Sequence, residues 1–323
     1  MSHYFTIPIN TDGIVADLNV AQNLKNALNS PFSVTDAFIY SHGWWTSATS
    51  ALSDYNQFSV ELSAVIARIA ALPNPVLTLL PGSPLGVAVH WPSMISDDDQ
   101  SWINKLEPLS FYTMAQRADQ VGKNAVYSLL RLLIEESPNI PRLHFLGHSF
   151  GCRVVCSAIQ EILDDSDTIP NGKDLNINVV LLEAAFDQND LEQGEVYGGL
   201  CGMPNLRLLA TFSALDQALT RDYPLSQDIN IFKGPGSSNA ALGGLGPTPK
   251  MISDFGGVTA LTINPGFNHL ASAAPTTRLV TADLTPLHES RPNYPDASHP
   301  NPDHHSDIFL PEIYELICGF LFK

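Results

Sequence analysis

Positive charge and cysteine are both scarce in this chain. Its 323 residues include only 16 Lys and Arg against 33 Asp and Glu, and the formal net charge is -17. That balance repels phosphate backbones and anionic membrane surfaces, so we expect no nucleic-acid partner. The four cysteines are scattered without zinc-like spacing, and we expect all of them to be reduced thiols.

Long apolar runs are absent as well. No stretch approaches the roughly 20 apolar residues that a membrane-spanning helix needs. The first ten residues lack the basic segment and apolar core of a secretory signal. From these absences we expect a cytoplasmic protein with no membrane span. Hydrophobic residues make up 44% of the chain and charged residues 15%, which excludes a disordered chain and allows a sizeable core.

Short apolar runs alternate with helical patterns along the chain. This alternation predicts an α/β fold with a doubly wound, mostly parallel sheet and helices on both faces. We expect one domain spanning residues 1–323, with lid or loop insertions near 187–204 and 218–255. Expected strands lie at 4–9, 37–40, 76–80, 87–90, 143–146, 177–182, 206–212 and 258–263, with 278–283 as a further candidate. Expected helices lie at 54–70, where Ser53 or Asp54 is the candidate N-cap, and at 113–136, 152–163 and 311–321.

The pentapeptide Gly147-His148-Ser149-Phe150-Gly151 lies between the strand-like run 142–146 and the helix-like run 152–163. In a strand-to-helix turn, small residues two before and two after a serine allow the backbone to bend sharply. That bend lifts the serine hydroxyl clear of the sheet. We therefore predict that Ser149 is a catalytic nucleophile on a nucleophile elbow.

A serine nucleophile needs a base to take its proton and an acid to orient that base. In doubly wound hydrolases the acid follows a later strand, and the histidine comes later still. The strand at 206–212 runs out into Asp216, which we predict to be the acid. Asp187, which follows the strand at 177–182, is the alternative.

The candidate bases lie just before the closing helix. We favour His305 over His304 because residues 306–308 lead directly from it into that helix. His304 is then expected to be exposed, and His288 and His299 to be solvated in a proline-rich loop.

A metal site is the alternative interpretation of the same region. Asp303, His304, His305 and Asp307 offer metal ligands, but no pair of them has a helical spacing such as H-E-x-x-H. We expect neither a metal nor a cofactor.

The tetrahedral intermediate of acyl transfer needs two hydrogen-bond donors for its oxyanion. One is expected to be the backbone N–H of Phe150, the residue after the nucleophile. The other is expected from the loop after an earlier strand, where the strand at 37–40 leads to a His-Gly pair and then to Trp44. The candidate substrate-pocket residues are His42, Gly43, Trp45, His148 and Trp91.

With these motifs the chain resembles the α/β-hydrolase superfamily, in its serine esterase and lipase group, over about residues 37–321. The resemblance implies an acyl-enzyme on Ser149 that water, activated by His305, resolves. We therefore expect a serine hydrolase acting on a small-molecule ester or acyl substrate. A lipase, thioesterase, amidase or acyltransferase can use the same triad, and a non-catalytic binding protein can use the same fold.

Overall fold

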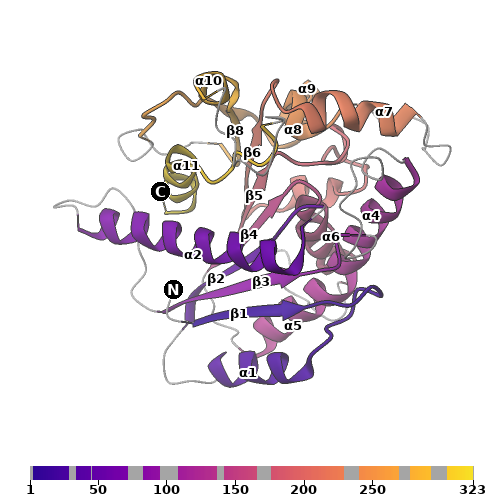
Figure 1. The fold of residues 1–323 in the computed structure, drawn as a ribbon, viewed down its shortest axis with the longest axis vertical. Helices are drawn as coiled ribbons and strands as arrows, with labels where there is room; N and C mark the ends of the chain where they lie inside the picture. Colours follow the sequence, from indigo (N-terminus) through magenta and orange to yellow (C-terminus); the bar gives the residue numbers. More distant parts are fainter. Residues whose placement is uncertain are drawn as a thin grey trace.

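The protein is described here from a computed structural model. It covers residues 3–28, 34–44, 46–71, 83–94, 108–136, 142–165, 176–228, 240–268, 277–291 and 304–322. Within these ranges, eight strands form one sheet in the order β1-β3-β2-β4-β5-β6-β8-β7 (Figure 1). Every pairing between neighbouring strands is parallel. The strands are β1 (His3–Pro8), β2 (Val34–Ser41), β3 (Ser83–His90), β4 (Arg142–His148), β5 (Ile177–Leu182), β6 (Leu206–Phe212), β7 (Val258–Thr262) and β8 (Leu279–Asp283).

Helices cover both faces of this sheet. The α-helices are α1 (Leu18–Leu28), α2 (Ala48–Ala70), α4 (Pro108–Val121), α5 (Tyr127–Glu136), α6 (Gly151–Asp164), α7 (Tyr223–Asp228), α8 (Leu242–Leu245), α9 (Pro249–Asp254), α10 (Thr285–Glu289) and α11 (Pro311–Phe322). Two π-helical turns, η1 (Gly122–Val126) and η4 (Ala218–Asp222), and one 3₁₀ turn, η3 (Gly198–Gly202), complete them. The doubly wound α/β fold expected from the sequence is confirmed.

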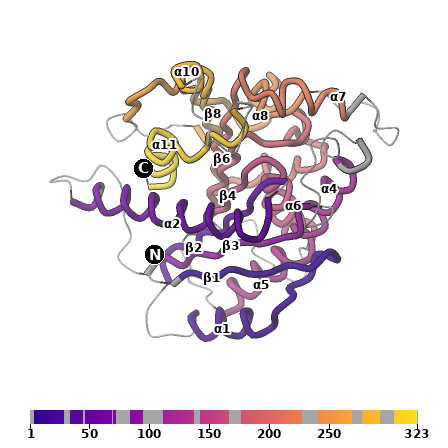
Figure 2. The backbone as a smooth tube through the Cα atoms, in the orientation of Figure 1, coloured from indigo at the N-terminus to yellow at the C-terminus, as the bar shows by residue number. Residues whose placement is uncertain are grey.

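Side chains of alternate strand residues pack into two separate apolar cores, one on each face of the sheet. In β2, for example, Ala37 and Ile39 pack with α1, α4, α5 and α6, whereas Phe38 and Tyr40 pack with α2 and α11. Helices α2 and α11 lie side by side on their face of the sheet (Figure 2). Because both strand faces are buried, these strands are continuously apolar in sequence rather than alternating.

The strand predictions hold for the described residues, and the candidate at 278–283 is β8. The candidate at 76–80 lies outside the described residues. The predicted start of the helix at 54–70 was wrong. Helix α2 begins at Ala48 rather than near residue 54, and the hydroxyl of Ser47 accepts the N–H of Ser50 at 3.1 Å. Ser47 is therefore the cap, and Ser53 and Asp54 lie inside the helix.

All four cysteines are buried and none forms a disulfide. Cys152 and Cys156 lie inside α6 with no exposed surface, where they pack inward as small apolar side chains. None of the described helices combines the length and apolarity needed to cross a bilayer.

The carboxyl ends of parallel strands lie at one common edge of the sheet. Five of these ends lead directly to the candidate site. Strand β2 leads to His42 and Gly43, β4 to Ser149, β5 to Glu183, β6 to Asp216, and β8 to α10. Ligands of open α/β sheets bind at this edge. The fold therefore collects in one place residues that lie far apart in the sequence.

Candidate active site

Ser149 occupies a sharp turn between β4 and α6. Its backbone φ is 55°, a left-handed conformation that costs a non-glycine residue of the order of 1–3 kcal/mol. Neighbouring backbone groups hold it there: the N–H of Ser149 donates to the carbonyl of Leu182 at 3.0 Å, and the N–H of Ala185 donates to the carbonyl of Ser149 at 3.3 Å. The strand-to-helix turn predicted from the sequence is present.

Gly151 allows α6 to begin directly against the end of β2. A Cβ at this position would lie 2.6 Å from the carbonyl oxygen of His42 and would overlap the backbone of Ser41. Both obstacles are backbone atoms, which cannot swing aside as a side chain does. Gly151, two positions after the serine, is therefore required for the close approach of the first turn of α6 to the end of β2.

Gly151→Ala is expected to destabilise the protein by about 3 kcal/mol, at the upper end of the usual cost of overpacking. The control is Gly202→Ala, since a Cβ at Gly202 would meet nothing within 4 Å, and we expect a change below about 0.5 kcal/mol there. Urea unfolding followed by circular dichroism measures both. Equal stabilities of the two variants would contradict the steric argument.

His305 lies between Ser149 and Asp216. Its Nε2 is 2.8 Å from the hydroxyl oxygen of Ser149, and its Nδ1 is 2.7 Å from Oδ2 of Asp216. Asp216 has no exposed surface, and its other carboxylate oxygen accepts the N–H of Leu219 at 3.0 Å. The structure thus brings the three predicted residues into hydrogen-bonding distance in the order serine, histidine, aspartate.

The alternative acid, Asp187, points elsewhere. One oxygen of its carboxylate accepts the phenol O–H of Tyr223 at 2.7 Å, and its backbone N–H donates to Asp190 at 3.2 Å. In this arrangement Asp187 joins loop 187–204 to η4 and α7. Asp216 is the carboxylate that hydrogen-bonds to His305.

His148 supports the segment that carries His305. Its Nε2 lies 2.7 Å from the backbone carbonyl of His305, to which it donates a hydrogen bond, and the two imidazole centroids are 4.9 Å apart. Burial lowers the pKa of His148 to about 3, so this imidazole is neutral at pH 7. The predicted pocket residue therefore lies beside Ser149 and holds the loop of His305.

The loop after β2 lies against Ser149. A Cβ at Gly43 would be 2.9 Å from the Cβ of Ser149, so only a glycine brings this backbone so close. His42 is buried beneath the loop, where its ring stacks on Trp91 at 5.5 Å, and burial lowers its pKa to about 3. The side chains of His42 and Trp91 are at most 1% exposed, so at Gly43 the loop presents main chain to Ser149.

Trp44 and Phe150 follow Gly43 and Ser149, respectively. Their rings pack edge to face at 5.6 Å, and the ring of Phe111 packs against both. This contact joins the loop after β2 to the first turn of α6, which are the two segments expected to donate to an oxyanion. Trp45 lies outside the described residues.

Two histidines are placed differently from the sequence expectation. His288 was expected to be solvated, but it lies on α10 with no exposed surface, and its Nδ1 is 3.0 Å from the hydroxyl of Ser213. His304 was expected to be exposed, but its side chain is 10% exposed and its Nδ1 is 2.8 Å from Asp307. The two rings stack at 5.3 Å. His288 is covered through its contact with Ser213, which follows β6, and His304 is covered in part by the ring of His288. Sequence patterning did not reveal these contacts. His299 and Asp303 lie outside the described residues.

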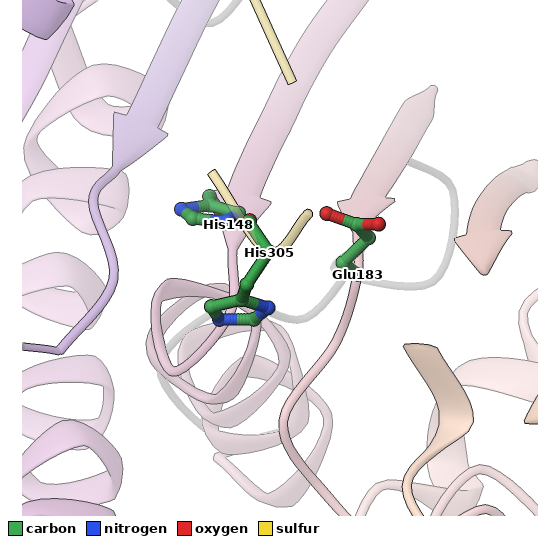
Figure 3. A group of neighbouring side chains, drawn as sticks. All are labelled: His148, Glu183 and His305. Carbon is green, nitrogen blue, oxygen red and sulfur yellow. Dashed lines mark hydrogen bonds between the residues drawn. The ribbon is translucent and has the colours of Figure 1, made fainter. Parts of the chain in front are cut away.

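Glu183 is a further residue of this edge that the sequence interpretation did not include. It directly follows β5 and is fully buried, and its carboxylate and the ring nitrogens of His148 and His305 lie within 4.8 Å of one another (Figure 3). The signal was available in the sequence, because an acidic residue immediately follows the predicted strand at 177–182. The candidate acid predicted after this strand is Asp187, four residues further on.

His148, Glu183 and His305 also form a set of groups with metal-ligand chemistry. Their imidazole nitrogens already make hydrogen bonds, however: both nitrogens of His305 do so, and Nε2 of His148 does. A cation bound through His305 would have to displace Ser149 or Asp216. These three side chains therefore fit the hydrogen bonds to Ser149 and Asp216 better than they fit a resident metal ion.

A parallel sheet covered on both faces, with a serine on a nucleophile elbow at its carboxyl edge, defines an α/β hydrolase. Residues 36–232 match the family described as alpha/beta hydrolase of unknown function (DUF900). This match spans more than half of the chain, and the chain belongs to that family. None of the curated proteins matches this chain.

Proposed function

We propose that the protein is a serine hydrolase that cleaves carboxylic esters through an acyl-enzyme intermediate. The observation that carries this proposal is the pair of distances at His305, 2.8 Å to the hydroxyl of Ser149 and 2.7 Å to Asp216. A serine hydroxyl becomes a competent nucleophile when an oriented imidazole accepts its proton. The strained backbone of Ser149 is consistent with a functional turn.

The reaction has two proton-balanced halves. Oγ of Ser149 attacks the ester carbonyl carbon while Nε2 of His305 takes the hydroxyl proton, and the resulting imidazolium then protonates the departing alcohol. Water next attacks the acyl group on Ser149, losing a proton to His305, and this proton returns to Oγ as the acid leaves. We assign oxyanion stabilisation to the backbone N–H groups of Trp44 and Phe150.

An esterase is favoured over a lipase by the packing of the two candidate lid segments. Most of the apolar side chains in the described parts of these segments lie in the core: Leu191, Leu200, Met203, Ala241 and Leu242 are at most 1% exposed, whereas Val196, Leu225 and Leu245 are 56%, 56% and 60% exposed. An apolar lid that opens at a lipid interface needs side chains that can leave the core. We therefore propose short, water-soluble esters as substrates.

A fluorophosphonate probe tests the proposal, because it reacts only with an activated serine. The purified protein is expected to be labelled at Ser149 and to hydrolyse p-nitrophenyl esters of short acids. A panel varied in acyl length, with a thioester and an anilide included, separates ester from thioester and amide cleavage. Absence of both labelling and turnover would mean that the fold serves binding without catalysis.

Asp216→Asn is expected to lower kcat by about 10⁴-fold, because the amide no longer holds His305 in the tautomer that accepts a proton at Nε2. Its control is Asp187→Asn, which removes the alternative acid from its contact with Tyr223 and is expected to change kcat by less than about three-fold. Steady-state hydrolysis of p-nitrophenyl acetate measures both. The opposite ranking would assign the acid to Asp187.

A further inference from the structure

Three non-glycine residues in the described part of the chain have a positive φ, and they lie at the candidate active site. They are Ser149 at 55°, Glu183 at 47° and His304 at 57°. Strained residues persist where the surrounding structure over-determines them, and they concentrate at functional sites. Two of them are the proposed nucleophile and the neighbour of the proposed base. The third, Glu183, has no part in the reaction proposed above.

The backbone around Glu183 is fixed by the same contacts that fix the nucleophile. The carbonyl before it, that of Leu182, accepts the N–H of Ser149 at 3.0 Å. Its own N–H donates to the hydroxyl of Thr211 on β6 at 3.0 Å. Helix α8 covers the turn so closely that a Cβ on Gly243 would lie 2.6 Å from the Cα of Glu183. The position of Glu183 is therefore coupled to that of Ser149.

The carboxylate of Glu183 lies among three imidazoles. It lies within 4.8 Å of the ring nitrogens of His148 and His305, and one of its oxygens is 3.9 Å from Nδ1 of His288. Figure 3 shows His305 between the end of β4, where His148 lies, and the end of β5, where Glu183 lies. The carboxylate has no exposed surface, so water screens its charge little.

Only one of these three imidazoles takes up a proton in the proposed reaction. Burial lowers the pKa of His148 to about 3 and that of His288 to about 4, so both stay neutral at pH 7. His305 becomes an imidazolium each time it accepts the proton of Ser149 or of water. An ionised carboxylate near it favours that form over the neutral one, and the imidazolium in turn favours the ionised form of Glu183.

We propose that Glu183 is a second acid of the site, a positioning residue whose carboxylate stabilises the imidazolium of His305 together with Asp216. This inference rests on the proposed serine-hydrolase function. Asp216 binds Nδ1 directly and sets the tautomer, whereas Glu183 acts through space from the neighbouring strand. The other titratable groups close to His305 or Glu183 are His148, Cys152 and His288. Asp283 and His304 lie around His288, and Asp307 binds His304.

Glu183→Gln tests the proposal, because it keeps the shape of the side chain and removes its charge. We expect kcat to fall about ten-fold with KM changed less than two-fold. Without the negative charge the imidazolium of His305 is less stable, so the base stays neutral to lower pH. The acidic limb of the kcat/KM profile is therefore expected to move down by about one pH unit, the equivalent of a ten-fold change in the protonation equilibrium.

Glu192→Gln is the matched control. It removes the same charge from a largely buried residue nine positions later, which contacts Thr248 and Lys250 rather than the site, and we expect its acidic limb to coincide with that of the wild type. In an Asp216→Asn background, Glu183→Gln is expected to lower the residual kcat at least ten-fold further. A Glu183→Gln enzyme whose acidic limb is unmoved has lost only structural support, and that result overturns the proposal.

A second variant covers the case in which Glu183→Gln does not fold. Glu183→Asp keeps the charge but places it one methylene further from His305. Because Coulomb interactions weaken with distance, we expect kcat to fall about three-fold and the acidic limb of the kcat/KM profile to move down by roughly half a pH unit. An unmoved limb again overturns the proposal. Fluorophosphonate labelling of Ser149 reports separately on the hydrolase function, so a labelled enzyme with an unmoved limb rejects Glu183 alone. A wild-type protein that is neither labelled nor active rejects both.

Discussion

Ser149→Ala is expected to lower kcat for a short p-nitrophenyl ester by about 10⁴- to 10⁶-fold and to abolish fluorophosphonate labelling. Without Oγ no acyl-enzyme forms, and His305 has no hydroxyl to deprotonate. The remaining catalysis comes from substrate binding and from oxyanion donors, which accelerate the attack of water modestly in triad mutants of other serine hydrolases. Steady-state hydrolysis and fluorophosphonate labelling of the same preparation measure the loss of kcat and of labelling.

Ser157→Ala is the matched control for this variant. Ser157 is a buried serine on α6, the helix that follows Ser149, and its hydroxyl donates to Asp119 at 2.8 Å. Its removal is expected to change kcat less than three-fold and to leave labelling intact. Both variants are expected to retain the wild-type circular dichroism spectrum. If Ser149→Ala keeps wild-type turnover, the assignment of the nucleophile is wrong.

His305→Ala is the second substitution with a large expected effect, again about 10⁴- to 10⁶-fold in kcat. Its imidazole is both the base that deprotonates Ser149 and the acid that protonates the leaving group, so its loss disables both halves of the reaction. Asp216 is then left buried without the imidazole that it orients. Turnover is expected to recover in part as the pH rises, because hydroxide replaces the missing base.

His304→Ala separates the two adjacent histidines. The ring of His304 binds Asp307 and stacks on His288 rather than contacting Ser149. We expect a loss of at most ten-fold, arising from disturbance of the loop. Measurement of kcat for both variants with one ester, from pH 5 to pH 10, gives the comparison. A larger loss for His304→Ala than for His305→Ala would reassign the base.

The fold was predictable because its signals are local. A strand buried on both faces is a short apolar run, as at Ile177–Leu182, and an amphipathic helix repeats every three or four residues, as in α6. The elbow is also local, since two glycines, a serine and the elements around it occupy consecutive positions. The start of α2 was missed because its first turns, from Ala48, contain serine, threonine and alanine and lack a clear apolar period.

The composition of the site was predicted in part. Chain order and strand ends favoured Asp216 and His305 over their alternatives. The structure brings both to Ser149, although His305 is 156 positions away from it along the chain. Glu183 also lies at a strand end, but a triad needs only one acid, and Asp216 and Asp187 already matched that role in the sequence. His288 was predicted to be solvated but is buried. Burial depends on which distant segments pack over a residue, and the residues next to it in the sequence do not show which segments those are.

By itself, the sequence determined the α/β architecture, the elbow at Ser149 and the identity of the acid and base candidates. Each follows from periodicity, turn chemistry or chain order, which are properties of nearby residues. Only the tertiary structure brought Asp216, and not Asp187, to His305, placed Gly43 against Ser149, and surrounded Glu183 with three imidazoles. Those relations depend on strand order and on packing at the common edge of the sheet, where residues distant along the chain approach to within a hydrogen bond.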